Sequence, residues 1–516
     1  MNSPLTQILA DSFSSNSDKL CVVDLDSTDE SNRVELTYKQ VQDAAGALIF
    51  KLDMLGKKSD GLKIGIVARN SANWVIADIA CLFGGYTAVP LPMAFSRTQA
   101  ENLAATCDMF LVDTAGAKTL AERWKIVRDP AHLIYLDTAA RLEGATLPRP
   151  LDPDGICKVI HTSGTTSQPK GVKITIAALQ QTLGSLCRAM PIETHKRYLS
   201  MVPLSLLLEQ VTAIYLPLLD GGTVHFLPEA CPILGEPGAC VDELIARLLR
   251  VRPSAMTVPP MVIERIAEHI NEPNKHLQEV MDYLTHRVLI TCGGATVSSE
   301  ILLSLASRGI HVYQGYGLSE NTSVVSVNTA KNQRIGSVGK PLEHVRVRIA
   351  ADRSIQILSS SLFSGYVWTD PSSCSFTDDG WLDTGDLGRL DEDGFLYVIG
   401  RKKNVLCLPN GRNVSPEQVE VELSNFPGVR EAVVFLHHID GLVALIISEP
   451  ALNIDDLSQW METVFSDIER PAVLWPVPVG SNLYMELFTA NCRPKRGEIT
   501  ATYLLRRPPP LPEISK

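Results

Sequence analysis

Segments of helical periodicity alternate with short runs of Val, Ile and Leu along the first part of the chain. The amphipathic stretch LTYKQVQDAAGALIFKLDMLG, which begins at Leu36, precedes the apolar strand KIGIV, and SANWVIADIACLFG precedes the strand YTAVPLP. The pattern recurs over residues 179–224, 241–258 and 280–313. Helices that alternate with strands cover the faces of a mostly parallel sheet. The sequence therefore predicts an α/β fold with helix-covered sheets.

The pattern changes after Gly336, where short strands and turns replace this alternation. VRVRIAADRSIQIL and WLDTGDLGRLDEDGFLYVIG contain the strands, and the Asp-Gly pair in the second segment is a hairpin signal. Beyond Arg401, SPEQVEVELSNFPG predicts a helix with Ser415 as N-cap and Pro416 at its first position, followed by the strand REAVVFLH. Because 516 residues exceed a single hydrophobic core, we predict two domains. Residues 1–401 form a large domain that ends in a β subdomain, and residues 402–516 form a small, mobile α+β domain.

The composition argues against several classes of partner. The formal net charge is −11, so the chain offers no basic field to a nucleic acid or an anionic membrane. The apolar stretch 201–219 contains Pro203 and Glu209, and therefore does not predict a transmembrane helix. The amino terminus lacks the pattern of a signal peptide, and the eleven cysteines lack zinc-binding spacing. We expect a cytoplasmic protein with reduced thiols that binds any polyanionic substrate through local groups.

A run of small hydroxyl residues and glycines, HTSGTTSQPKGV, begins at His161. It follows the predicted strand KVI, and we expect a helix after it. Glycines let backbone N–H groups approach a phosphate, hydroxyls add donors, and a lysine adds a cation. The residues with these properties are Ser163, Gly164, Thr165, Thr166, Lys170 and Gly171. Pro169 and Gly171 break the Walker spacing, so the segment predicts a triphosphate cradle unlike that of a kinase or GTPase.

The order of residues in this loop is similar to the phosphate loop of the adenylate-forming superfamily, which includes acyl-CoA synthetases, peptide-synthetase adenylation domains and luciferases. Further segments resemble the motifs of that superfamily in the required order, namely GGATVSS, YQGYGLSEN, GWLDTGDLG and GRKKNVLCLPNGRNVSPEQVE, which start at Gly293, Tyr313, Gly380 and Gly400. The glycine-rich turns at Gly293 and Gly315 follow predicted strands, at the edge where open α/β sheets bind ligands. The resemblance covers most of the chain.

The resemblance implies roles for individual residues. Tyr316 would stack on adenine, Ser319 would contact the α-phosphate, and Glu320 would help to hold Mg2+, which prefers carboxylate oxygen. Asp386 resembles the carboxylate that accepts both ribose hydroxyls, and Arg401 resembles the arginine that reaches the same sugar. The nucleotide-binding set implied in this way is Thr162, Ser163, Gly164, Thr165, Thr166, Lys170, Gly293, Gly294, Ala295, Gly315, Tyr316, Gly317, Ser319, Asp386 and Arg401, with Thr166 as a second metal contact.

The chemistry that the resemblance implies has two steps. A carboxylate oxygen attacks the α-phosphorus of ATP and expels pyrophosphate, and a thiol then takes the acyl group. Two anions repel each other, so the site must neutralise charge and fix an in-line approach, without a nucleophilic side chain. The resemblance also implies that the small domain rotates about Lys403 between the steps, and that Gly411 then lines the path of the thiol.

The carboxyl-terminal segment departs from the family pattern. Relatives carry a catalytic lysine in a motif such as PKTxxGK, whereas this chain reads LFTANCRPKRGEI from Leu487. One alignment puts Arg493 at the catalytic position, and another puts Glu498 there. A carboxylate cannot stabilise the negative charge that develops on the α-phosphate. We therefore predict that Lys495 is the adenylation cation, with Arg493 as the alternative.

Two further departures lie near the expected acid pocket. Ile176 and Leu206 each replace a histidine of the family pattern, although Glu209 keeps its position. Because binding pockets are mostly apolar, we predict a tunnel lined by Leu206, Leu207, Met256, Val258 and Met261. Core packing would explain these residues equally well.

The sequence thus predicts an ATP- and Mg2+-dependent ligase that activates a fatty or other apolar acid and passes it to the thiol of CoA. Two alternatives stay open. The acceptor could be the phosphopantetheine of a carrier protein, although the net acidity disfavours docking of an acidic carrier. The chain could also be a degenerate nucleotide- or acyl-binding protein without turnover, against which Glu320, Asp386 and Gly411 argue.

Overall fold

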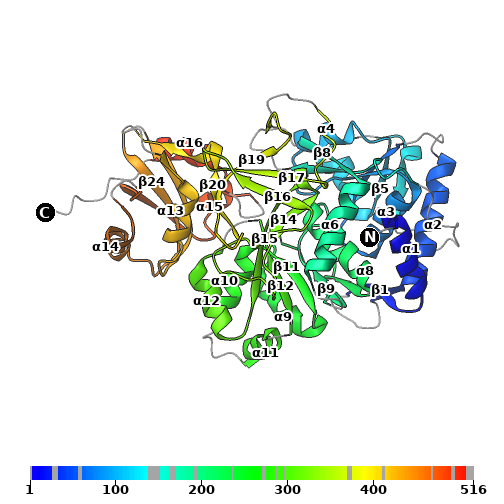
Figure 1. Ribbon diagram of the computed structural model, residues 1–516, viewed down its shortest axis with the longest axis horizontal. Coiled ribbons are helices and arrows are strands. Elements are labelled where there is room, and N and C mark those ends of the chain that lie inside the picture. Colours follow the sequence, from blue (N-terminus) through cyan, green and yellow to red (C-terminus); the bar gives the residue numbers. More distant parts are fainter. Residues whose placement is uncertain are drawn as a thin grey trace.

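The computed structural model describes residues 3–25, 33–55, 61–126, 128–136, 151–162, 170–190, 194–234, 236, 238–269, 275–285, 287–294, 297–368, 375–408, 413–437, 439–466, 469–489 and 494–506. Figure 1 shows the amino-terminal elements on the right, the carboxyl-terminal elements on the left, and the sheet that contains β16, β17 and β19 above the middle. Helices and strands alternate over most of the chain, so the predicted α/β class is confirmed.

A mostly parallel sheet forms the amino-terminal layer. Within the described residues its order is β6-β5-β3-β4-β7-β8, and only the pair β7–β8 is antiparallel. The strands are β3 (Lys63–Val67), β4 (Thr87–Pro90), β5 (Met109–Val112), β6 (Leu133–Tyr135), β7 (Ile156–Thr162) and β8 (Lys170–Thr175). The helical elements nearby in sequence are α2 (Tyr38–Leu55), α3 (Ala72–Gly84), α4 (Arg97–Ala104), α5 (Thr114–Lys118), η2 (Thr119–Arg123) and η3 (Pro130–His132). Ser71 caps the first turn of α3, and Gly85 ends this helix in the left-handed conformation, so that the chain turns directly toward β4.

A second, larger sheet follows. Its order among the described strands is β15-β14-β13-β12-β11-β9-β10-β1-β2. These strands are β1 (Leu20–Asp24), β2 (Val34–Thr37), β9 (Arg197–Ser200), β10 (Thr223–Phe226), β11 (Ala255–Val258), β12 (Leu289–Cys292), β13 (Val312–Leu318), β14 (Ser323–Val327) and β15 (Lys340–Pro341). The associated helical elements are α1 (Leu5–Ser15), α6 (Ile176–Ala189), α7 (Leu207–Glu209), η5 (Gln210–Tyr215), α8 (Leu216–Asp220), α9 (Val241–Val251), α10 (Pro260–His269), α11 (Lys275–Leu284), α12 (Ser299–Ser307) and η6 (Ser319–Asn321). The apolar stretch that begins at Met201 includes η5, every residue of which is buried.

The predicted β subdomain is an antiparallel sheet of β16 (Val345–Ile349), β17 (Ser354–Ser359), β18 (Ser375–Phe376), β19 (Leu382–Leu390) and β20 (Leu396–Arg401). Gly394, in the Asp-Gly turn between β19 and β20, has a φ of 82°. That positive φ is the reason why glycine suits the hairpin.

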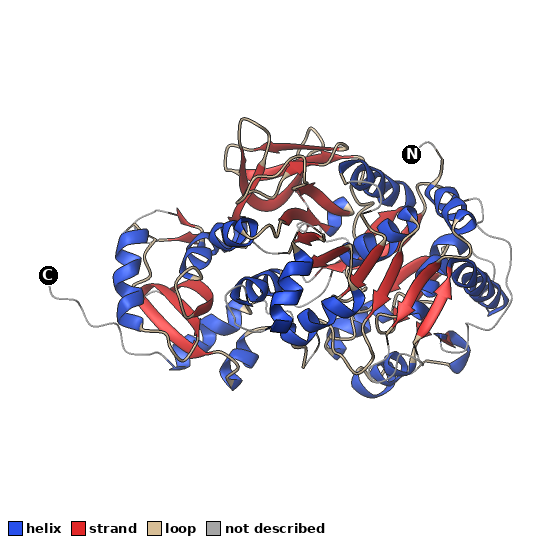
Figure 2. Ribbon diagram, turned by 90° about the horizontal axis from the view of Figure 1, so that it is seen from below, coloured by secondary structure: helices blue, strands red, loops and turns tan. Residues whose placement is uncertain are grey.

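The carboxyl-terminal region begins where β20 ends. Its elements are η7 (Lys402–Asn404), β21 (Leu406–Cys407), β22 (Asn413–Val414), α13 (Pro416–Leu423), β23 (Val429–His437), β24 (Gly441–Ser448), α14 (Ile454–Val464), β25 (Val473–Pro478), α15 (Asn482–Leu487) and α16 (Arg496–Arg506). Alternate residues of β23 and β24 enter two hydrophobic clusters, one with Leu457 of α14 and one with Tyr503 of α16. Figure 2 shows this small sheet and its helices at the end of the molecule that holds the carboxyl terminus. The division at residues 401 and 402 stays a prediction that this separate core supports.

Two local predictions are wrong. The phosphate loop is followed by a strand, β8, and not by a helix, because Val172 and Ile174, on either side of the half-buried Lys173, are buried on one face of the sheet. The segment around Gly315 is not a turn, because β13 continues through it and changes partner from β12 to β14. Ser415 is the N-cap residue of α13 and Pro416 its first residue, as predicted, although the Ser415 hydroxyl makes no capping hydrogen bond and donates instead to the Ile399 carbonyl at 3.2 Å.

Among the helices that the structure describes, none combines the length and hydropathy that a membrane crossing requires. Cys81, Cys157 and Cys292 are unpaired and buried. Burial raises the pKa of their thiols.

Candidate active site

The second sheet and the β subdomain meet at a group of side chains that we call the nucleoside corner, Tyr316, Asp386 and Arg401. The Tyr316 hydroxyl in β13 donates to Oδ2 of Asp386 in β19 at 2.6 Å. Arg401 is the cross-strand neighbour of Asp386, and its Nε lies 3.1 Å from Oδ1. Both oxygens of the carboxylate therefore have a partner. The fold thus brings together three residues that the sequence assigned to one nucleoside.

Burial controls the electrostatics of the nucleoside corner. Asp386 is 5% exposed, and burial raises its pKa, although Arg401 and the Tyr316 hydroxyl offset part of this effect. Burial and the nearby Asp386 carboxylate raise the pKa of Tyr316 well above its usual range. The phenol therefore stays protonated and remains a donor at neutral pH.

Basic side chains converge beside this corner. Partial burial lowers the pKa of Lys403, and the positive charges of Arg401 and Lys170 contribute to the decrease. Lys170 is the first residue of β8 in the first sheet, so the end of the phosphate loop faces the start of the carboxyl-terminal region. A cavity of about 300 Å3 is lined there by Thr384, Gly385, Arg401, Lys402 and Lys403. Several cations around one cavity suit a polyphosphate ligand.

Glu320 lies in η6, directly after β13. Its Oε1 accepts the Tyr366 hydroxyl at 2.7 Å, and its carbonyl accepts the Phe363 N–H at 2.9 Å. In the described part of the chain, no cluster of three or more His, Cys, Asp and Glu side chains could hold a metal. An ion at this position would thus be held by one carboxylate and by phosphate oxygens, which is the mode that Mg2+ favours. Glu320 fits this requirement, because it is half-buried and its Oε2 accepts no hydrogen bond from a described residue.

The glycines of the motifs at the same edge of the sheet serve two purposes, a backbone with positive φ and close packing of strands. Gly293 and Gly294 directly follow β12, and Gly294 has a φ of +93°, which an L side chain rarely adopts. In β13, a Cβ on Gly317 would lie 1.8 Å from the Ser323 carbonyl oxygen, and one on Gly315 would lie 3.2 Å from that of Ser326. The Ser319 hydroxyl, which follows them, makes no hydrogen bond within the described residues.

The predicted residues that lie outside the described part of the chain are Ser163, Gly164, Thr165, Thr166, Ala295, Gly411 and Arg493. Thr162 ends β7, and its side chain also lies outside the description. In the ladder between β7 and β8, Thr162 pairs with Lys170. The antiparallel pairing therefore brings the two ends of the phosphate loop together beside Lys403.

Lys495 directly precedes α16 in the carboxyl-terminal region. Its Nζ donates to the Glu486 carbonyl at 2.8 Å and lies 3.2 Å from a carboxylate oxygen of Glu498. Both partners belong to the same region as the lysine. No described contact joins Lys495 to the groups around Asp386.

Part of the predicted acid pocket lies near the buried carboxyl of Glu209. Leu206 is 40% exposed, while Leu207 is buried. Glu209 accepts the Ser200 hydroxyl at 2.7 Å, and burial raises its pKa to about 8. Leu206 therefore presents an apolar, accessible side chain where the family pattern has a histidine.

The other predicted pocket residues belong to the core. Met256 and Val258 are buried with residues of α9, α10 and α12, and Met261 packs against the same cluster. Their neighbour Thr257 lies on the opposite face of β11, where its hydroxyl is 2.8 Å from that of Thr291. Core packing therefore accounts for Met256, Val258 and Met261.

The protein-family model described as AMP-binding enzyme matches residues 9–362, which include the phosphate loop, the motif at Gly293 and Glu320. The chain belongs to the AMP-binding enzyme family. The resemblance to adenylate-forming enzymes is thereby confirmed.

Relatives in this family carry several names. The long-chain-fatty-acid–CoA ligase ACSBG2 of Gallus gallus is 28% identical, and the match covers 82% of this chain and 66% of that protein. The long-chain-fatty-acid–CoA ligase FadD15 of Mycobacterium bovis is 29% identical over 81% of this chain and 78% of its own length. A malonate–CoA ligase of Arabidopsis thaliana is 25% identical over 80% and 74%. The chain thus spans just under two thirds of the first of these relatives.

Solved structures agree with the fold of this family. The anthranilate CoA ligase AuaEII in complex with anthranoyl-AMP has a TM-score of 0.82 at 18% identity, over 97% of both chains. The o-succinylbenzoate CoA synthetase (MenE) of Bacillus subtilis in complex with the intermediate OSB-AMP has a TM-score of 0.77 at 21% identity, over 96% of this chain and 98% of that one. At these identities the likeness shows the fold alone.

Sequence reasoning missed Tyr366, which contacts both a predicted metal ligand and a predicted phosphate ligand. The surrounding segment SLFSGYVW contains no charged residue and shows no spacing typical of a binding loop. The fold alone brings this tyrosine to Glu320, from 46 residues further along the chain.

Proposed function

We propose that this chain activates a fatty or other apolar carboxylic acid with ATP and transfers the acyl group from the adenylate to the thiol of CoA. The observation that carries the proposal is the convergence of Lys170, Glu320 and the Asp386–Arg401 pair from distant segments of the sequence. The names of the CoA ligase relatives support the same reaction.

In the first step an oxygen of the acid attacks the α-phosphorus of ATP, a new O–P bond forms, and the bond to pyrophosphate breaks. Both reactants are anions, so the positive charges of Lys170, Arg401 and Lys403 lower the cost of their approach. Asp386 is held by Arg401 and Tyr316, and is therefore preorganised to accept the ribose hydroxyls. Mg2+, when it is bound with ATP, neutralises charge on the phosphates.

In the second step the sulfur of the thiol attacks the acyl carbon. The bond between that carbon and the phosphate oxygen breaks, AMP leaves with the electron pair, and the thiol loses its proton. Lys403 lies in η7, two residues after the end of β20, where the carboxyl-terminal region begins. We propose that this region rotates about Lys403 and brings Gly411 to the path of the thiol.

One face of β12 is suited to bind an apolar acid. Leu289 and Thr291 are half-buried, whereas Ile290 and Cys292, which point to the other face, are buried. Gly293 continues the accessible face toward the nucleoside corner, and a Cβ there would lie 3.7 Å from the Leu208 side chain. The strand from Leu289 to Gly293 spans about 13 Å, which suits an extended alkyl chain.

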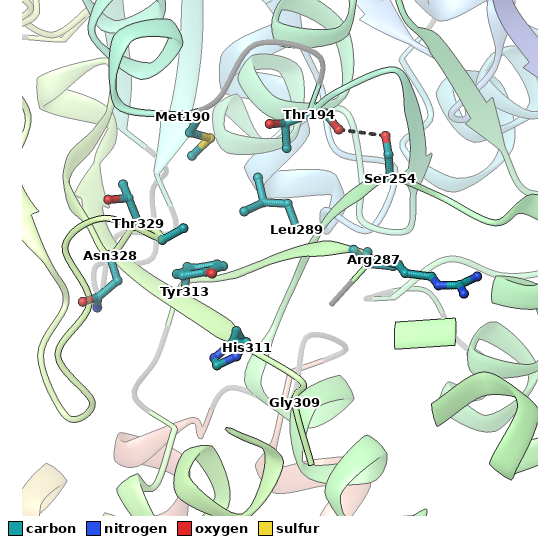
Figure 3. A pocket seen from close by; sticks show the side chains of 12 residues that line it. Met190, Thr194, Ser254, Arg287, Leu289, Gly309, His311, Tyr313, Asn328 and Thr329 are labelled. Atoms are coloured by element: carbon teal, nitrogen blue, oxygen red, sulfur yellow. Dashed lines mark hydrogen bonds between the residues drawn. The ribbon is translucent and has the colours of Figure 1, made fainter. Parts of the chain in front are cut away.

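A cavity of about 360 Å3 opens at the far end of this face. In Figure 3 the side chains of Met190, Leu289 and Tyr313 project toward the same space, whereas Arg287 extends away from it. This volume lies in the range of small-molecule sites, and the lining combines these apolar side chains with polar ones, among them Thr194, Ser254 and Asn328. We therefore propose that the acyl chain lies along Leu208, Thr291 and Leu289, in place of Met256 and Val258.

The test is ATP/pyrophosphate exchange over acids from acetate to palmitate, with aromatic and amino acids included. We expect exchange with the longer alkyl acids, followed by thioester formation when CoA is added. Thioester formation with a phosphopantetheine carrier and not with CoA would mean that the acceptor is a carrier protein. A protein that binds ATP but exchanges pyrophosphate with no acid would contradict the proposal.

The acyl assignment has a separate test. Leu289→Trp fills the cavity, so we expect it to shorten the longest acid that supports exchange. Leu303→Trp is the matched control, because Leu303 in α12 is 57% exposed. An unchanged chain-length profile in Leu289→Trp would place the acyl chain elsewhere.

A further inference from the structure

The segment from Ser361 to Val367 lies alongside the strand that leaves the phosphate loop. The N–H of Val367 donates to the Gly171 carbonyl at 2.8 Å, the Lys173 N–H donates to the Gly365 carbonyl at 3.0 Å, and the Ser364 N–H donates to the Lys173 carbonyl at 2.9 Å. Tyr366 is the bridge partner of Val172 in this pairing. The backbone of the segment is therefore fixed against β8.

The same segment also holds the turn that carries Glu320. The Phe363 N–H donates to the Glu320 carbonyl at 2.9 Å, and the Thr322 hydroxyl donates to the Ser361 carbonyl at 2.7 Å. The Ser361 hydroxyl donates to the Asn321 carbonyl at 3.2 Å. The segment thus connects the phosphate-loop strand of the first sheet to η6 of the second.

Tyr366 contacts a charged group on each side of this connection. Its hydroxyl donates to Oε1 of Glu320 at 2.7 Å, and Nζ of Lys170 lies 5.3 Å from the centre of its ring. Phe363 packs edge-on against the same ring, with 4.9 Å between the ring centres, and Tyr366 is buried. A buried ring held in this way cannot turn aside without the loss of several contacts.

We propose that Tyr366 is a positioning residue for the Mg2+–ATP complex, an inference that rests on the proposed function. The hydroxyl orients the Glu320 carboxylate so that its other oxygen can face a cation, and the ring holds the Lys170 ammonium by a cation–π contact. Glu320 and Lys170 carry opposite charges and attract each other. The tyrosine between them prevents a direct ion pair, which would remove both groups from the metal and the phosphates.

The test is Tyr366→Phe, which keeps the ring and removes only the hydroxyl. We expect the Mg2+ concentration that gives half-maximal pyrophosphate exchange to rise roughly tenfold, because hydrogen bonds to charged groups are among the stronger ones in proteins. Calorimetric binding of ATP should weaken by a similar factor with Mg2+ present, and should be unchanged without it. Thioester formation from a supplied acyl adenylate and CoA should keep the wild-type rate.

Tyr397→Phe is the matched control, because the Tyr397 hydroxyl also donates to a carboxylate, that of Asp391, at 3.2 Å. It should leave the Mg2+ dependence unchanged. In Tyr366→Leu, which also removes the ring, we expect ATP binding to weaken without Mg2+ as well, because the contact with Lys170 is lost.

Either of two results would overturn the inference. One is a wild-type Mg2+ dependence in Tyr366→Phe, and the other is an equal loss of ATP binding with and without Mg2+, which would indicate a general structural role. The calorimetric test requires no turnover. Failure of the proposed reaction in the wild-type protein is therefore distinguishable from failure of this inference.

Discussion

The nucleoside corner and the Lys495 segment are both proposed to act on one nucleotide, yet the fold holds them in different ways. Asp386 and Arg401 face each other across a hairpin, so the register of β19 and β20 sets their distance. Lys495 lies in the carboxyl-terminal region, and its described partners, Glu486 and Glu498, belong to that region. Sheet register thus fixes the binding part of the site, whereas the role that we propose for Lys495 requires a movement of the carboxyl-terminal region.

The largest effect that we expect comes from Lys495→Ala. Loss of the cation that faces the developing charge should lower pyrophosphate exchange by about 10²- to 10³-fold. Thioester formation from a supplied acyl adenylate should change little, because the α-phosphorus has already reacted. Measurement of both half-reactions in one preparation separates these outcomes.

Two controls sharpen this comparison. Lys118→Ala removes a lysine of α5 that is 71% exposed and should have no effect. Arg493→Ala tests the alternative cation. Wild-type exchange in Lys495→Ala together with a large loss in Arg493→Ala would transfer the role to the arginine.

Asp386→Asn should have the next largest effect. The amide keeps the shape of the side chain but loses the charge that pairs with Arg401 and accepts the ribose hydroxyls. Hydrogen bonds to charged groups contribute about 1.5 to 3 kcal/mol, so we expect ATP binding to weaken roughly 10- to 100-fold. Calorimetry with ATP measures this directly.

The control for this variant is Asp379→Asn, in the turn between β18 and β19 of the same subdomain. Asp379 also pairs with an arginine, Arg348, at 2.6 Å, but it lies outside the nucleoside corner. Equal losses of ATP affinity in both variants would show that the sheet was disturbed in general, and would contradict a specific role for Asp386.

The way in which the fold places each residue also decides whether the sequence could predict its position. Tyr316, Asp386 and Arg401 stand in motifs, and strand pairing brings motif residues together once the α/β pattern is recognised. Tyr366 could not be found in this way, because it acts through a contact with Glu320 that depends on the packing of two sheets. The roles of Met256 and Val258 could not be decided from the sequence either. An apolar strand residue fits a pocket or a core equally well until the two faces of the strand are known.

Lys403→Pro tests whether the carboxyl-terminal region has to move about Lys403. Lys403 lies in the helical turn η7, so the φ of proline fits the present conformation and resists another. Since Lys495 has no described contact with the nucleoside corner in this conformation, we expect pyrophosphate exchange and thioester formation both to slow at least tenfold, which corresponds to a barrier about 1.4 kcal/mol higher. Lys403→Ala is the control, because it removes the charge and leaves the backbone free. If Lys403→Ala slows both steps as much as Lys403→Pro does, the side chain and not a hinge is responsible.

A contact between β23 of the carboxyl-terminal region and α10 should make the stability of the protein depend on pH, an effect smaller than those above. Arg430 in β23 pairs with Glu268 in α10 and with Glu449 at 2.5 Å. Beside it, burial raises the pKa of Glu431 to about 8, and the nearby charge of Glu264 adds to this effect. Oε2 of Glu431 is buried and has no hydrogen-bond partner among the described residues. The contact therefore favours a protonated Glu431.

Glu431→Gln should remove this pH dependence. Above a pH of about 5 the unfolded chain has lost the Glu431 proton, whereas the folded protein keeps it until about pH 8, so stability falls as the pH rises through this window. Between pH 5 and pH 9, the Tm of the wild type should fall by roughly 2 to 4 °C more than that of the variant. Glu422→Gln is the matched control, because Glu422 is exposed on α13. Parallel Tm curves for the wild type and Glu431→Gln would mean that Glu431 is ionised in the folded protein. The contact between α10 and β23 would then hold the charge of Glu431 beside Glu264 and Glu268, offset by Arg430 and by Arg265, which also pairs with Glu268.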